Sequence, residues 1–252
     1  MSYVLKRHPF PIKAHVEHVL VLTYALPETV LAPLLPPGLE LDTYEGHAFL
    51  AVATVHTRDL RPSFLPRAFG RDFFLTGYRV FTRFEMADGK VLRGLRIIRT
   101  DTDSASMVTW GNRLTRYGYR KAEVECSKQS GELHFKVVTP NAEADIEFTA
   151  NIARLPGPLP PGSPFPDIET ASGFVAPLPY TFDYEPETKS MIVVLGRRPR
   201  WNPQPVEVQV HRNTFLESGP FNQGKAVLAN AFYMEDVPYS WDRGRREPVP
   251  AR

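Results

Sequence analysis

Residues 47–62 read HAFLAVATVHTRDLRP, and the part from Ala48 to Val55 is apolar at nearly every position. Successive side chains of a strand point to opposite faces, so a strand of this composition has both faces covered. Val19–Tyr24 and Met191–Leu195 have the same character. These segments therefore predict central strands of a sheet that other parts of the chain cover from both sides.

Other segments alternate apolar and polar residues at the strand period of two. Leu133–Val137 and Ile146–Ala150 follow this pattern, which indicates half-buried antiparallel strands. Residues 87–90 (ADGK) lie between Tyr78–Glu85 and Val91–Thr100, two segments rich in strand-forming residues. An Asp-Gly pair in that position predicts a tight hairpin.

Two short helices are predicted between the strands. Pro27–Leu35 begins with a proline, which is favoured in a first helical turn, and ends before another proline. Ser104–Tyr117 follows residues that commonly cap helices, and it places Met107, Trp110, Leu114 and Tyr117 on one face. Gly111 in its middle indicates close packing there.

Length and composition set the class of protein. The chain has 252 residues, and we expect one domain over 1–252 with a proline-rich surface loop at 155–166 and a frayed tail at 243–252. It has no apolar run of the ~20 residues needed to span a membrane and no N-terminal apolar segment, which predicts a cytoplasmic protein. Cys126 is the only cysteine, which excludes disulfides. A net charge of +2 argues against a nucleic-acid or membrane partner.

Several motifs occur in a fixed order along the chain. They are PPGLELD at 36–42, HAFLAVATVHTRDLRP at 47–62, WGNRL at 110–114 with YGY at 117–119, and YMEDVPYSWDR at 233–243. This succession resembles the DUF2071 (YqjF-like) family of the acetoacetate-decarboxylase-like superfamily. The resemblance implies a mainly β fold, namely a single antiparallel, cone-shaped β-barrel with a few short helices and a small-molecule cavity. It also implies a homo-oligomer, since such families often form one.

The resemblance does not extend to the chemistry of the true decarboxylases. Those enzymes form a Schiff base between the substrate ketone and a lysine amine whose pKa is lowered. In the matching segment, GNRL at 111–114 and GYRK at 118–121 enclose only Thr115, Arg116 and Tyr117. Arginine cannot form the imine, because its guanidinium does not deprotonate in proteins. Lys121 shares a strand face with two glutamates, which favours solvent exposure over catalysis. We therefore predict no Schiff-base lysine and no cofactor.

Six polar side chains are candidates for binding a substrate. These residues are Glu17, His56, Arg99, Arg113, Arg116 and Tyr117. Arg99 enters the cavity and holds a carboxylate, pairs internally with Asp101, Asp103 or Glu85, or is exposed at a strand edge. Arg113 and Arg116 lie near a helix end, where cations are favoured by the helix dipole. Arg116 also falls where the resemblance places the reactive lysine, so its charge could polarise a carbonyl.

His15, Glu17 and His18 suggest a metal site by composition alone. In a regular strand, however, His18 points away from the other two, so no metal site is predicted. The chain also lacks the glycine-rich phosphate loop and the G-x-S-x-G motif, which argues against nucleotide cofactors and serine hydrolase chemistry.

We interpret the chain as an acetoacetate-decarboxylase-like protein that handles a small carbonyl or carboxylate compound in a barrel cavity. If it is an enzyme, we expect lyase-like, cofactor-free chemistry, and its catalytic residues remain open. The alternative is a non-catalytic small-molecule-binding protein on the same fold.

Overall fold

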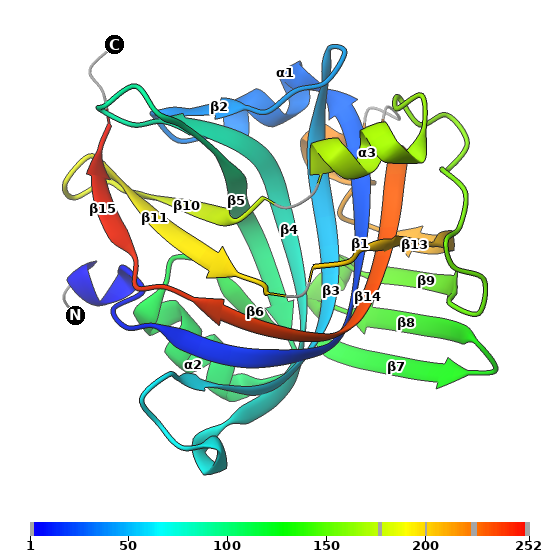
Figure 1. Ribbon diagram of the computed structural model, residues 1–252, viewed down its shortest axis with the longest axis horizontal. Coiled ribbons are helices and arrows are strands. Elements are labelled where there is room, and N and C mark those ends of the chain that lie inside the picture. Colours follow the sequence, from blue (N-terminus) through cyan, green and yellow to red (C-terminus); the bar gives the residue numbers. More distant parts are fainter. Residues whose placement is uncertain (1–2, 176–177, 200, 223–225, 250–252) are drawn as a thin grey trace.

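The computed structural model describes residues 3–175, 178–199, 201–222 and 226–249 (Figure 1). In this part of the chain an 11-stranded sheet and a 4-stranded sheet dominate, with few short helices. The large sheet contains β1 (Ile12–Pro27), β2 (Leu39–Leu41), β3 (His47–Pro62), β4 (Arg71–Glu85), β5 (Val91–Thr102), β6 (Tyr119–Lys121), β10 (Tyr180–Glu185), β11 (Ser190–Arg197), β12 (Gln204–Pro205), β14 (Val227–Trp241) and β15 (Arg245–Pro248). The small sheet contains β7 (Glu123–Gln129), β8 (Glu132–Val138), β9 (Ile146–Asn151) and β13 (Glu207–Asn213). The α-helices are α1 (Glu28–Leu31), α2 (Ala105–Leu114) and α3 (Ile168–Val175).

The large sheet closes on itself as a ring. Strands β14, β1, β3, β4, β5, β10 and β11 are neighbours in that order, and β11 pairs back with β14 through Gly196 and Trp241. Neighbours around the ring are antiparallel except β5 and β10, which are parallel. Figure 1 shows these strands curving around a common centre, with the small sheet outside them. The predicted mainly β fold with a few short helices is confirmed.

Both faces of the central strands are buried, as their composition predicts. Leu20 and Leu50 point out of the ring and pack with Phe135 of the small sheet in one apolar cluster. Val19 and Val55, at odd positions of the same strands, belong to a second cluster on the inner face. The small sheet therefore covers the outer face of these strands, and the inner face is buried inside the ring.

Helix α2 starts at Ala105 after Ser104, whose hydroxyl caps the helix as predicted. A Cβ on Gly111 would lie 2.4 Å from the ring of Tyr119, so the close packing expected at this glycine is confirmed. The helix is shorter than the expected Ser104–Tyr117, because it ends at Leu114 and leaves Tyr117 outside it, and the expected apolar face is only partly buried, with Trp110 56% exposed. The first predicted helix is shorter than expected, with α1 followed by a 3-10 turn.

The segment 155–166 connects β9 to α3, and its Phe165 is buried against Phe49 with ring centroids 5.4 Å apart. The tail differs from the expectation of a frayed segment over 243–252. Residues 245–248 form β15, which pairs with β11 from Ser190 to Val193. The free backbone edge of β11 explains this order, because pairing satisfies its hydrogen-bonding groups.

No helix among the described residues is long and apolar enough to cross a bilayer.

Gly94 allows a close approach between β5 and β10, the two parallel neighbours in the ring. A Cβ at Gly94 would stand 2.4 Å from the carbonyl oxygen of Tyr180, and a backbone atom cannot yield without separating the strands. We expect Gly94→Ala to lower the free energy of unfolding by about 1–3 kcal/mol in urea titrations. Gly173→Ala in α3 is the matched control, because nothing lies within 4 Å of its added Cβ. Equal stability of the two variants would refute the close approach.

Candidate functional site: an arginine-lined cavity

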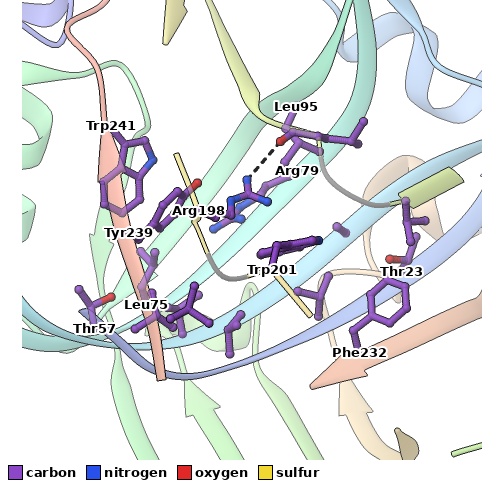
Figure 2. Close-up of a pocket in the computed structure, with 18 of the residues that line it drawn as sticks. Thr23, Thr57, Leu75, Arg79, Leu95, Arg198, Trp201, Phe232, Tyr239 and Trp241 are labelled. Atoms are coloured by element: carbon purple, nitrogen blue, oxygen red, sulfur yellow. Dashed lines mark hydrogen bonds between the residues drawn. The ribbon is translucent and has the colours of Figure 1, made fainter. Parts of the chain in front are cut away.

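The inner face of the ring borders a cavity of ≈ 110 Å³ (Figure 2). A single buried water needs a cavity of roughly 10–15 Å³. The cavity is several times larger than that, so it can hold a small organic molecule. Strands β1, β3, β4, β5 and β14 supply most of the wall, together with residues around α3 and the segment after β11. Most lining side chains are apolar. The lining residues with polar atoms in their side chains are Thr23, Thr57, Arg79, Arg198, Trp201, Tyr239 and Trp241.

Arg79 reaches the cavity because of the local sequence of β4. Leu75 and Phe81 line the same cavity, and Gly77 lies between them on the strand. The absence of a side chain at Gly77 leaves room for the guanidinium, since a Cβ there would lie 3.0 Å from Arg79 Nε. The strand therefore places one cation within an otherwise apolar wall.

Arg79 has no anionic partner in the described part of the chain. No ion pair joins it to any described carboxylate, and its Nε is buried without a hydrogen-bond partner. Burial lowers the pKa of its guanidinium, and the nearby Arg198 cation lowers the same pKa further. An arginine nevertheless remains charged in proteins, so the cavity contains an uncompensated positive charge.

Arg198 supplies a second cation from the segment that follows β11. Its guanidinium lies 4.2 Å from the ring centroid of Trp201 and 5.0 Å from that of Tyr239. It donates a 3.2 Å hydrogen bond to the carbonyl oxygen of Leu178, and no carboxylate pairs with it among the described residues. Figure 2 shows Arg198 between the two rings and beside Arg79. The indole N–H of Trp201 is likewise buried without a partner.

None of the six residues proposed from sequence belongs to the described lining of this cavity. Arg99 pairs with Asp101 through bonds of 2.8 and 3.0 Å, which is the internal pairing considered as its alternative. Arg113 lies over the ring of Trp110 at 5.2 Å. Arg116 donates a 2.7 Å hydrogen bond to Glu187. The guanidinium groups of these three arginines are therefore engaged elsewhere.

Tyr117 lies near the cavity arginine without lining the cavity itself. Burial raises the pKa of its phenol well above the usual value, and the Arg79 cation opposes that rise. Tyr119 shows the same pattern, with burial raising its pKa to about 12 and Arg79 opposing. These two phenols thus belong to the surroundings of Arg79.

Glu17 and His56 lie together with His18, in a group separate from the cavity lining. Atoms Glu17 Oε2 and His56 Nδ1 are 3.4 Å apart, and Arg58 holds the Glu17 carboxylate and lowers its pKa. Burial lowers the pKa of His18 to about 4 and also lowers that of His56, so both rings are neutral at pH 7.

The expectation that His18 points away from Glu17 was wrong. Their potential ligand atoms, with that of His56, all lie within 4.8 Å of one another. The cause is a register shift between β1 and β3, where Val16 pairs with Thr57 and His18 with His56. Glu17 has no partner across the strands, and such a bulge breaks the alternation of side chains.

The described lining of the cavity contains no lysine. Lys121, the lysine nearest in sequence to the reactive segment, is exposed and donates a hydrogen bond to the carbonyl oxygen of Asp103. Lys225 lies outside the described residues.

Solved structures of acetoacetate-decarboxylase-like proteins are similar to this chain over most of its length, so the closed ring of strands has the acetoacetate-decarboxylase-like fold. An acetoacetate decarboxylase from Legionella pneumophila is similar with a TM-score of 0.62 and 14% identity, covering 94% of this chain and 87% of that chain. An acetoacetate-decarboxylase-like enzyme from Sphingomonas wittichii RW1 has a TM-score of 0.61 and 11% identity, covering 94% of this chain and 92% of that one. The enduracididine biosynthesis enzyme MppR, complexed with pyruvate, has a TM-score of 0.60 and 14% identity, covering 94% of this chain and 90% of its own. At these identities the likeness concerns the fold.

The family is shown by the sequence itself. The profile of DUF2071, described as an uncharacterized conserved protein, matches residues 13–238. The chain therefore belongs to the DUF2071 family, as its motifs suggest. No curated protein matches it.

Proposed function

We propose that this protein binds a small carbonyl or carboxylate compound in the cavity of the ring, with Arg79 and Arg198 holding the carboxylate. One observation carries the proposal: the Arg79 guanidinium faces the cavity with its Nε buried and without an ion pair to any described residue. A charge that is withdrawn from water even in part is destabilising unless it is paired, so such a group is normally matched by a partner. An anionic ligand would supply that partner.

The shape and polarity of the cavity narrow the ligand class. A planar guanidinium can donate two parallel N–H hydrogen bonds to a carboxylate. These charge-assisted hydrogen bonds are strong where little water competes for the same groups. The surrounding wall includes Val19, Val21 and Val55, which suit a short apolar tail. Pyruvate, which is bound in the MppR structure, is a small keto acid of this class and serves as the first probe.

The chemistry available to the cavity is stabilisation of negative charge. With a β-keto acid, one guanidinium on the ketone oxygen would stabilise the enolate that forms when the bond to the carboxylate carbon breaks and carbon dioxide leaves, and a proton from solvent water would then convert the enolate into the ketone. No amine is required for that step, so turnover would proceed without an imine. Tyr239 is the phenol positioned to accompany the two cations.

The alternative is a non-catalytic binding protein, and one observation favours it. The described lining contains no histidine, aspartate, glutamate, lysine or cysteine. General acid–base catalysis usually relies on such groups, and their absence from the described wall would leave binding as the whole function.

Thermal unfolding of the intact protein with millimolar pyruvate or acetoacetate tests the binding proposal. We expect a rise in Tm that grows with ligand concentration and that acetone, which has no carboxylate, does not reproduce. NMR of acetoacetate then separates the two functions, because only an enzyme accelerates its loss above the uncatalysed rate. Equal responses to acetone and to the carboxylates would refute the arginine-held carboxylate.

Borohydride reduction tests the absence of an imine. After incubation with acetoacetate and borohydride, we expect the intact mass of the chain to be unchanged. A stable adduct on any lysine would contradict the proposed chemistry.

A further inference from the structure

Outside the cavity, three potential metal ligands converge from β1 and β3. The carboxylate of Glu17 and the imidazoles of His18 and His56 offer atoms that all lie within 4.8 Å of one another. The bulge at Glu17 creates this arrangement, because a regular strand would turn consecutive side chains to opposite faces. From this convergence we propose that Glu17, His18 and His56 bind a divalent transition-metal ion of the zinc type.

The distance between one pair of donors, from Glu17 and His56, agrees with a shared ion. Zinc binds imidazole nitrogen and carboxylate oxygen at roughly 2.0–2.2 Å, so two such ligands in a tetrahedral site stand about 3.4 Å apart. The distance between His56 Nδ1 and Glu17 Oε2 is 3.4 Å. A direct charge-assisted hydrogen bond between these groups would be shorter, at about 2.7–2.9 Å.

The surroundings hold the three ligands in place. Arg58 donates to the Glu17 carboxylate and also to Asp72 at 2.9 Å, so its charge is shared between two acids. The ring of His56 stacks on Phe74 with centroids 4.1 Å apart. Outer contacts of this kind orient metal ligands and are a regular part of metal sites.

The donor types select the class of ion. Two imidazoles and one carboxylate suit zinc and its neighbours in the transition series, whereas magnesium and calcium prefer oxygen donors. Three protein ligands leave one position of a tetrahedral ion for water or another small molecule. The side chain of Glu17 is 47% exposed, so an ion can reach the site from solvent.

Cys126 on β7 lies next to His18, so an experiment must distinguish whether its sulfur is also a metal ligand. Its Sγ lies 3.6 Å from His18 Nε2. Its Sγ does not belong to the group of potential ligand atoms that all lie within 4.8 Å of one another. We assign the ion to Glu17, His18 and His56, and the Cys126→Ser variant tests that assignment.

Isothermal titration of the tag-free, full-length protein with zinc sulfate at pH 7 tests the site. We expect one high-affinity ion per chain, and a loss of affinity of at least tenfold in each of His18→Ala and His56→Ala. Glu17→Gln, a change at a half-exposed side chain, keeps the test valid if a histidine variant unfolds. His15→Ala on the same strand is the matched control, because His15 contacts Asp236 instead of this group.

Other outcomes overturn the proposal. Absence of zinc binding by the wild-type chain at 100-fold molar excess would do so. Wild-type affinity in Glu17→Gln, His18→Ala and His56→Ala would do so as well. A loss of binding in Cys126→Ser with full binding in the histidine variants would assign the ion to the cysteine alone.

Discussion

Replacing Arg79 by methionine is expected to stabilise the protein while abolishing its affinity for small carboxylates. The Arg79 side chain is partly buried, its Nε is buried without a hydrogen-bond partner, and no described carboxylate pairs with it, whereas methionine has a similar length and no charge. Exchanging buried charge for well-packed apolar atoms commonly raises the free energy of unfolding by about 1–4 kcal/mol. Natural sites give up stability in this way where function requires it.

Urea unfolding and ligand titration of Arg79→Met measure the two effects. Arg83→Met is the matched control, since Arg83 lies on the same strand with a side chain that is 44% exposed. We expect the control to change stability by less than ~0.5 kcal/mol and to keep the ligand-induced rise in Tm. A destabilised Arg79→Met, or one that still responds to pyruvate, would contradict the role given to this residue.

Breaking the Arg99–Asp101 pair is expected to cause the largest loss of stability. Both residues are buried, with Arg99 6% and Asp101 1% exposed, and they share two hydrogen bonds. Removing one partner leaves the other charge buried without compensation, which costs about 3–5 kcal/mol. We therefore expect that loss in the free energy of unfolding for Arg99→Met and for Asp101→Asn, measured in urea.

The double variant Arg99→Met/Asp101→Leu completes the test. An apolar pair of similar volume leaves no orphaned charge, so we expect it to be more stable than either single variant. Glu143 also contacts Arg99 at 2.9 Å but is half-exposed, so water can replace that contact. Additive losses in the double variant would show that the two side chains do not act as a pair.

The sequence predicts the strands of this fold well because burial on both faces leaves a clear signal. Ala48–Val55 and Val19–Tyr24 are apolar throughout, and both lie in the ring with the small sheet on one side. The same signal does not reveal that the second face borders a cavity. That depends on closure between β11 and β14, whose contacts are distant in sequence.

The candidate site is harder to predict from the sequence, because it also depends on contacts between residues that are distant in the chain. Arg79 lies in a segment of apolar residues, and its only local signal is the alternation of Leu75, Gly77 and Phe81 on its face. Arg116 occupies the position where the resemblance places the reactive lysine, yet its guanidinium forms an ion pair with Glu187, which is distant in the sequence. Alternation also fails at Glu17, where a bulge brings His18 to the same side.

A crystal structure of the protein soaked with pyruvate tests the central claim most directly. The account predicts the carboxylate inside the ring, within hydrogen-bond distance of the guanidinium groups of Arg79 and Arg198, with no covalent bond to the chain. Pyruvate linked to a lysine nitrogen, or a cavity that remains free of the acid while pyruvate binds elsewhere, would contradict it.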